Sequence, residues 1–171
     1  FSHFSTDCVV SGTVGNYCED HMPDPIDLYG KSKLYGECLS DNCITFRISV
    51  IGRELNTDRG LLDWFIKQTS VMGYANAIFS GLPSTAIGDF IANYLNVIAN
   101  KSGLYHLSAD PISKYKLLNM FNERMGFGIK INHSNTPIIN RSLNSTLLRN
   151  EFGWRPDSWQ NMIDKMCVSQ Y

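Results

Sequence analysis

Tyr29 and Lys33 are spaced four residues apart in the run Tyr29-Gly-Lys-Ser-Lys33, and Thr6 ends a short apolar run upstream. On a helix this spacing places a phenol and an ammonium on one face, within reach of each other. A nearby cation favours the phenolate form, which helps a tyrosine exchange a proton with a carbonyl oxygen near neutral pH. The hydroxyl of Thr6 can hydrogen-bond the same oxygen. The three residues predict a carbonyl-reducing site, with a solvated helix face as the alternative for Tyr29 and Lys33.

The elements that must position these residues alternate between strand and helix. Phe1 to Val10 and Cys43 to Ile51 are predicted strands, and the second is apolar and β-branched, as expected inside a parallel sheet. Leu28 to Leu39 is a predicted helix between them, so the order implies a right-handed crossover. The pattern also predicts strands over residues 77–80, 104–107 and 129–132 and helices over residues 60–69, 143–152 and 159–167.

Two further helices are predicted from their caps. One begins at Ser84-Thr85 and stops at Gly103, and the other begins at Ser113 and stops at Gly126. Both carry apolar side chains at helical spacing, which indicates that each packs one face on a core.

Several stretches of the chain follow one another in a recognisable order: Ser5-Thr-Asp-Cys-Val-Val-Ser-Gly12, Tyr29-Gly-Lys-Ser-Lys-Leu-Tyr-Gly-Glu37, Phe46-Arg-Ile-Ser-Val-Ile-Gly52, Gly103-Leu-Tyr-His-Leu-Ser108, Arg141-Ser-Leu, Phe152-Gly-Trp154 and Ser158-Trp159. Together they span nearly the whole chain. In this order they resemble the extended short-chain dehydrogenase/reductases that act on nucleotide sugars. The resemblance is closest to the dTDP-4-dehydrorhamnose reductase-like branch.

The resemblance implies a role for each residue of the predicted site. Tyr29 would be the general acid that protonates the keto oxygen as hydride arrives from the nicotinamide. Lys33 would assist Tyr29 and hydrogen-bond the nicotinamide ribose, and Thr6 would hold and polarise the carbonyl. Ser49 and Val50 would line the nicotinamide pocket together with Tyr29 and Lys33, although a plain buried strand explains Ser49 and Val50 equally well.

Substrate contacts are expected from Thr6 and from the residues that follow it, Asp7 and Cys8. Cys8 falls where relatives often carry an aromatic residue. Arg53 is placed to reach a sugar or phosphate, with a surface arginine as the alternative. Two serines lie where the family contacts the nucleotide sugar, Ser80 and Ser84, and for Ser84 a helix cap is the alternative.

The predicted fold class is α/β, the C-terminal part of a Rossmann-type parallel sheet plus a smaller α/β substrate-binding domain. Residues 1–52 are expected to form the sheet and residues 53–171 mainly the second domain, with residues 103–108 returning to the sheet. The resemblance implies that the nucleotide sugar binds between the two domains.

A dinucleotide-binding fold begins with a strand and a glycine-rich turn at a helix N-terminus. Neither Gly12-Thr-Val-Gly15 nor Gly126-Phe-Gly128 has the third glycine or that setting. Relatives carry this part before the Ser-Thr-Asp motif. We therefore expect NADPH or NADH to be the cofactor of the complete protein, with no evident place for the hydride donor on this chain alone. Without the N-terminal half, strands that normally lie in the middle of the sheet would have an exposed edge. A truncated sequence, a separate chain that supplies this half, or self-association that covers the edge would each account for it.

Composition excludes several other classes of protein. The 171 residues are 43% hydrophobic with a formal net charge of −1, so we expect a globular protein and no nucleic-acid partner. No apolar stretch is long enough to span a membrane. Five cysteines without a C-x-x-C pair predict neither disulfides nor a metal site, and they favour a reducing cytoplasmic location. Cys8 and Cys43 are expected to be small buried hydrophobes.

The sequence therefore predicts NAD(P)H-dependent reduction of a 4-keto-6-deoxy nucleotide sugar, an activity expected to serve polysaccharide biosynthesis. An epimerase or dehydratase of the same superfamily is the first alternative. Dehydratases usually carry additional acidic residues beside the catalytic threonine; Asp7 is present here, but no glutamate follows it directly. The second alternative is a fragment that binds nucleotide sugars without catalysis. The sequence also leaves open whether the protein forms a homo-oligomer.

Overall fold

The computed structural model describes residues 1–54, 56, 57 and 59–168. Three parallel strands form its first sheet: β1 (Ser2–Thr6), β2 (Ile44–Ile48) and β7 (Gly103–His106), in the order β1-β2-β7. The register pairs Phe4 with Phe46 and Phe46 with Tyr105. A segment from the second half of the chain thus lies in the same sheet as the first two strands, whereas the predicted division into two domains stays a prediction.

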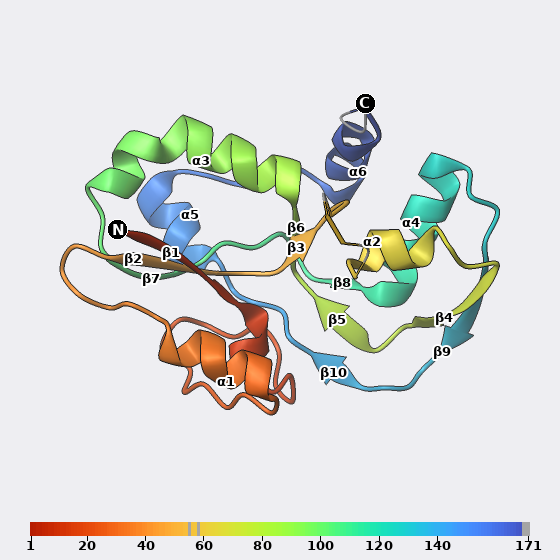
Figure 1. Ribbon diagram of the computed structural model, residues 1–171, viewed down its shortest axis with the longest axis horizontal. Coiled ribbons are helices and arrows are strands. Elements are labelled where there is room, and N and C mark those ends of the chain that lie inside the picture. Colours follow the sequence, from red (N-terminus) through yellow and green to blue (C-terminus); the bar gives the residue numbers. More distant parts are fainter. Residues whose placement is uncertain (55, 58, 169–171) are drawn as a thin grey trace.

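Every residue of β2 is buried, because both faces of this sheet are covered. Figure 1 shows α3 (Ser84–Ala99) and α5 (Thr146–Phe152) on one side of the strands and α1 (Leu28–Tyr35) on the other. Phe46 is the centre of the first core, with the rings of Phe4 and Phe90 each 5.7 Å from its own. Apolar burial on this scale stabilises the sheet by roughly 25 cal/mol for each Å² removed from water.

A second core is built from short strands and two helices. Its elements are β3 (Val50–Ile51), α2 (Leu61–Phe65), β4 (Ser70–Tyr74), β5 (Ala77–Phe79), β8 (Ile112–Ser113) and α4 (Lys114–Met125), with β9 (Lys130–Ser134) packed against it. Two further strands are β6 (Leu82–Pro83), whose Leu82 belongs to the first core, and β10 (Ile139–Asn140). β5 lies between β10 and β8, and β4 pairs with β9. The last helix, α6 (Trp159–Val168), contributes to both cores through Met162 and Ile163.

Several predicted elements needed correction. Ser84 is the first residue of α3 and not its cap, because the N-cap position belongs to Pro83 and carries no side-chain hydrogen bond. The first predicted strand ends at Thr6, where the short 3-10 helix η1 (Asp7–Val9) begins, and α1 ends at Tyr35 instead of residue 39. The predicted helix over 143–152 begins only at Thr146. Ser113 and Gly126 cap α4 as predicted. Of the helices in the described ranges, none is long and apolar enough to cross a membrane.

Candidate active site

The first part of the site is the turn that follows β1. Thr6 caps η1, since its Oγ1 accepts the backbone N–H of Cys8 at 3.2 Å. The same hydroxyl donates to Oδ1 of Asp7 at 3.2 Å. Both side chains are buried at the carboxyl end of β1. The local hydrogen bonds therefore fix the orientation of the Thr6 hydroxyl.

Helix α1 begins directly against this turn. Asp27 caps the helix by accepting the backbone N–H of Gly30 at 2.7 Å. A Cβ at position 30 would lie 2.2 Å from the carbonyl oxygen of Cys8, a main-chain atom that cannot rotate away. Glycine is thus required at this close approach of two backbones, and it brings the neighbouring Tyr29 beside the Thr6 turn.

Lys33, one turn further along α1, returns to β1. Its Nζ donates to the carbonyl oxygen of Phe4 at 2.6 Å. Tyr29 and Lys33 both line a cavity of about 440 Å³ that also includes Thr6. The phenol-bearing side chain of Tyr29 is 57% exposed. The structure therefore brings the three predicted catalytic residues to one cavity.

Four other predicted site residues line the same cavity: Asp7, Cys8, Ser49 and Val50. Ser49 joins β2 to β3 and is held by its carbonyl oxygen, which accepts the backbone N–H of Leu82 at 2.8 Å. Val50 is 55% exposed. Apolar wall and polar groups thus meet where the strands end, the edge at which parallel α/β sheets bind ligands.

A second cavity of about 230 Å³ shares Asp7, Cys8 and Ser49 with the first. Its remaining walls come from β5, from Ile139 and from two cationic side chains, Lys114 and Arg141. Burial raises the pKa of the Asp7 carboxyl, while the hydrogen bond from Thr6 and the charges of Arg141 and Lys114 act in the opposite direction. Burial also raises the pKa of the Cys8 thiol.

Cys8 is half-buried, not a buried hydrophobe as predicted, whereas Cys43 is buried at the start of β2. The Sγ of Cys8 accepts from Nη1 of Arg141 at 3.5 Å. Cys8 lies in the wall that separates the two cavities. Its side chain is therefore accessible from the site.

The remaining predicted substrate residues do not line either cavity. Arg53 donates from Nε to Oδ1 of Asp63 at 2.9 Å. Ser80 is buried, and its Oγ accepts the backbone N–H of Leu143 at 2.8 Å, so it ties two segments of the fold together. Ser84 is exposed in the first turn of α3. Their proposed contacts with a substrate stay predictions.

Sequence reasoning missed the buried ion pair behind α1. Glu37 accepts from Nε and Nη2 of Arg47, both at 2.8 Å, and from the hydroxyl of Ser5 at 2.7 Å. The two charged side chains are 3% and 4% exposed. Glu37 thus holds the end of α1 to β1 and β2. Glu37 ends the sequence motif that begins at Tyr29, and this position was the one sign in the sequence that it has a role near the site.

Cys18, Asp20 and His21 place one potential metal-ligand atom each within 4.8 Å of one another. However, Nδ1 of His21 accepts the backbone N–H of Cys18 at 3.0 Å, and burial raises the pKa of the Cys18 thiol. A metal requires a thiolate and a neutral imidazole with its second nitrogen protonated. The arrangement disfavours a metal, and the predicted absence of one stays a prediction.

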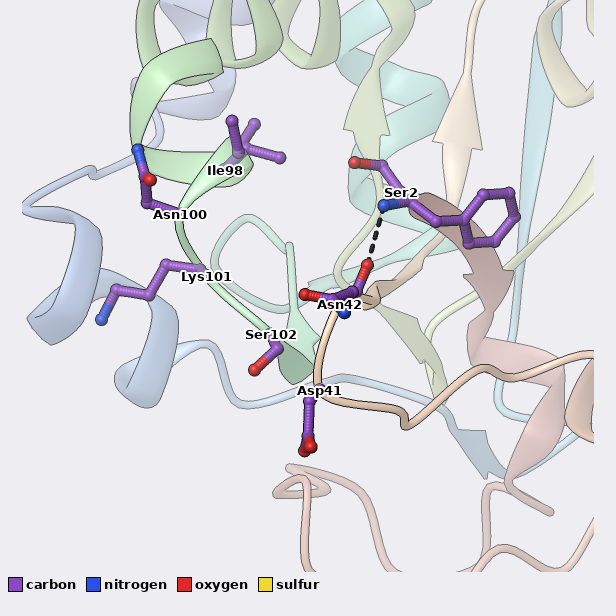
Figure 2. A pocket seen from close by; sticks show the side chains of 9 residues that line it. Ser2, Asp41, Asn42, Ile98, Asn100, Lys101 and Ser102 are labelled. Carbon is purple, nitrogen blue, oxygen red and sulfur yellow. Dashed lines mark hydrogen bonds between the residues drawn. The ribbon is translucent and has the colours of Figure 1, made fainter.

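A third cavity of about 430 Å³ lies at the opposite, amino-terminal ends of the sheet strands (Figure 2). It is lined by Phe1, Ser2, Asp41, Asn42 and residues 98–102, and the amino group of Phe1 donates to the carbonyl oxygen of Asn42 at 2.8 Å. None of the predicted site residues line it. Ligands of parallel α/β sheets bind at the other edge, so this cavity is a weaker candidate for the active site.

Comparison with protein families identifies the chain. The family model of the RmlD substrate binding domain matches residues 1–171. The chain belongs to this family. The dTDP-4-dehydrorhamnose reductase of Salmonella typhimurium is 36% identical over 120 residues, which cover 63% of this chain and 39% of the reductase. The match therefore spans well under half of that curated relative.

Solved structures show the same fold. A dTDP-4-dehydrorhamnose reductase from Bacillus anthracis, in complex with NADP, has a TM-score of 0.84 at 20% identity and covers 99% of this chain and 65% of that one. A reductase of the same name from Clostridium acetobutylicum has a TM-score of 0.82 at 16% identity, covering 98% of this chain and 64% of that one. At these identities the likeness establishes the fold, and the predicted α/β class with a Rossmann-type parallel sheet is confirmed.

Proposed function

We propose that this chain carries the catalytic residues and much of the substrate site of an NAD(P)H-dependent reductase that acts on a 4-keto-6-deoxy nucleotide sugar. The observation that carries the proposal is the meeting of Thr6, Tyr29 and Lys33 in one cavity at the carboxyl ends of the strands. Membership of the RmlD substrate binding domain family supports the substrate class.

Tyr29 is the proposed general acid. Its exposed phenol lies on the cavity wall, where it can give its proton to a keto oxygen as the carbonyl carbon is reduced. The ammonium of Lys33 has three donors, and one is used by the carbonyl oxygen of Phe4. The other two have no acceptor among the described residues, so they can hydrogen-bond a ribose hydroxyl and stabilise negative charge on the phenol.

Thr6 would hydrogen-bond the same keto oxygen. Its single proton now points to Asp7, so binding of a carbonyl requires this proton to turn into the cavity. Asp7 would keep the electrostatic support of Arg141 and Lys114 during that change. The turn at Thr6 thus links the position of the carbonyl to the charged cluster of the second cavity.

The residues of the first cavity fit the nicotinamide end of a dinucleotide. Ile48 and Val50 supply apolar wall, and Lys33 supplies unused donors. A bound reduced nicotinamide would supply the hydride. The NADP complex of the Bacillus anthracis protein supports this cofactor class. The sequence contains no glycine-rich turn for the pyrophosphate, so we expect a cofactor site completed by residues outside this chain.

The test is Tyr29→Phe in the complete protein. Loss of the general acid should lower the rate of nicotinamide oxidation by about 10²- to 10⁴-fold while substrate affinity changes little. Tyr35→Phe, on the exposed face of the same helix, is the matched control and should retain full turnover. Retained turnover in the Tyr29→Phe variant would refute the assigned acid.

A separate titration tests the isolated chain. NADPH and a dTDP- or UDP-linked sugar are added in turn while bound ligand is measured by calorimetry. Binding of the sugar nucleotide without NADPH would identify the chain as a binding fragment whose catalysis depends on further residues.

The free cysteines in the described residues agree with the proposed cytoplasmic location.

A further inference from the structure

The second cavity contains two cations that the catalytic proposal does not use. Lys114 begins α4, and Arg141 follows β10. Both lie in the wall formed with Phe79 of β5, next to Asp7 and Cys8. This wall belongs to the part of the fold built from β5, β8, β10 and α4 (Figure 1).

The ammonium of Lys114 is poorly compensated. It lies 3.8 Å from the centroid of the Phe79 ring, and burial lowers its pKa while the charge of Asp7 raises it. Among the described residues, no hydrogen-bond acceptor is bound to the Lys114 ammonium. A cation stacked on a ring face in a partly desolvated site gains strongly from an incoming oxyanion.

Arg141 has unused donors as well. Its Nη1 donates to the sulfur of Cys8, which is a weak acceptor, and its buried Nε has no partner within the described part of the chain. A guanidinium normally binds carboxylate or phosphate through two parallel N–H donors. Arg141 is therefore a ready oxyanion ligand.

The charges set the kind of anion that fits. With all groups ionised, Lys114, Arg141 and Asp7 sum to one positive charge. Each phosphate of a nucleotide-sugar diphosphate carries one negative charge at neutral pH and neutralises that sum. An uncharged sugar ring would leave this net positive charge and the Nε of Arg141, which has no partner among the described residues, without compensation.

We propose that Lys114 and Arg141 bind a phosphate group of the nucleotide-sugar substrate in the second cavity. This assignment rests on the proposed function for the identity of the ligand. The two cavities share Asp7, Cys8 and Ser49, so a sugar ring attached to that phosphate extends towards Thr6 and Tyr29. The substrate is thereby held by its charge at a fixed distance from the reacting carbonyl.

The test compares binding of dTDP and of thymidine to the 171-residue chain by calorimetry. Lys114→Gln and Arg141→Gln should each weaken dTDP binding at least tenfold and leave thymidine binding unchanged, and Arg141→Lys should recover part of the loss. Lys116→Gln and Arg155→Gln, two exposed positions, are the controls and should bind dTDP like the parent.

Three results would overturn the proposal. The first is dTDP affinity within twofold of the parent in both Gln variants, and the second is a parent chain that does not bind dTDP. In the third, the Gln variants weaken NADP binding and spare dTDP, which would assign the cations to the phosphates of the coenzyme. dTDP lacks the keto sugar on which Tyr29 would act, so the outcome of this test is independent of Tyr29. The reductase proposal can therefore fail while the phosphate site stands, and the phosphate site can fail while the reductase proposal stands.

Discussion

Acid should destabilise this protein through one buried histidine. His106 in β7 is fully buried, and its Nδ1 lies 2.9 Å from the carbonyl oxygen of Tyr17. A carbonyl oxygen only accepts, so Nδ1 carries the proton of the neutral ring. Nε2 is buried without a partner in the described residues. The backbone of Asn144 offers a second proton some support, but this support is smaller than the penalty that burial imposes on the charged ring.

Burial, reinforced by the positive charge of Arg47, lowers the pKa of His106 to about 4. The unfolded chain has an ordinary histidine pKa of about 6.5, so the unfolded state binds the proton first as the pH falls. The contribution of neutral His106 to the free energy of unfolding is therefore fully present above about pH 6.5 and is lost progressively as the pH falls towards 4. At about 1.36 kcal/mol per pKa unit, the 2.5-unit difference corresponds to roughly 3 kcal/mol, of which about 2 kcal/mol is lost by pH 5.

Urea unfolding at several values between pH 7 and pH 5, followed by tryptophan fluorescence, measures this loss. His106→Asn keeps a donor near the position of Nδ1 and removes the titration. The variant starts less stable because it leaves a cavity, but its free energy of unfolding should fall by about 2 kcal/mol less than that of the parent. Burial raises the pKa of Glu19 and Asp7, which act in the opposite direction in both proteins and cancel in the difference. Parallel losses in parent and variant would refute the reasoning.

Three further perturbations address other contacts. Glu37→Ala should cost about 3–5 kcal/mol in urea unfolding because Arg47 is left buried and unpaired, and a second change, Arg47→Met, should recover much of it; a loss below 1 kcal/mol would contradict this. Hydrogen bonding with Cys43 lowers the pKa of Cys38 to about 7, so Cys38 should react first with a disulfide reagent at pH 7, and a fast phase surviving Cys38→Ser would exclude it. Ser113→Ala should cost about 1 kcal/mol through the lost cap of α4, whereas unchanged stability would mean the cap is unimportant.

The catalytic candidates were predictable because their geometry is local. The i, i+4 spacing of Tyr29 and Lys33 fixes one helix face, and Thr6 ends the strand beside it. The bounds of α4 were predictable for the same reason, since Ser113 and Gly126 are caps whose side-chain and backbone requirements are readable in sequence.

Features that depend on distant pairing were not predictable. Lys114 and Arg141 meet because β5 pairs with β8 on one side and with β10 on the other, which no local pattern announces. The start of α3 was misplaced for a related reason. Pro83 is held in the pairing of β6 with β3, so the helix begins immediately after that strand and Ser84 falls inside it.

The attachments of α1 to the sheet determine how its catalytic candidates can move. Gly30 abuts the backbone at Cys8, and Glu37, just past the helix end, is bound to Arg47 in β2. Between these two attachments, Nζ of Lys33 is bound to the carbonyl oxygen of Phe4 in β1. The helix backbone is therefore held to the sheet along its length, and a shift of α1 as a body would have to break all three contacts. Tyr29 can then approach or leave a substrate mainly by rotation of its own exposed side chain, while the ammonium of Lys33 stays in place.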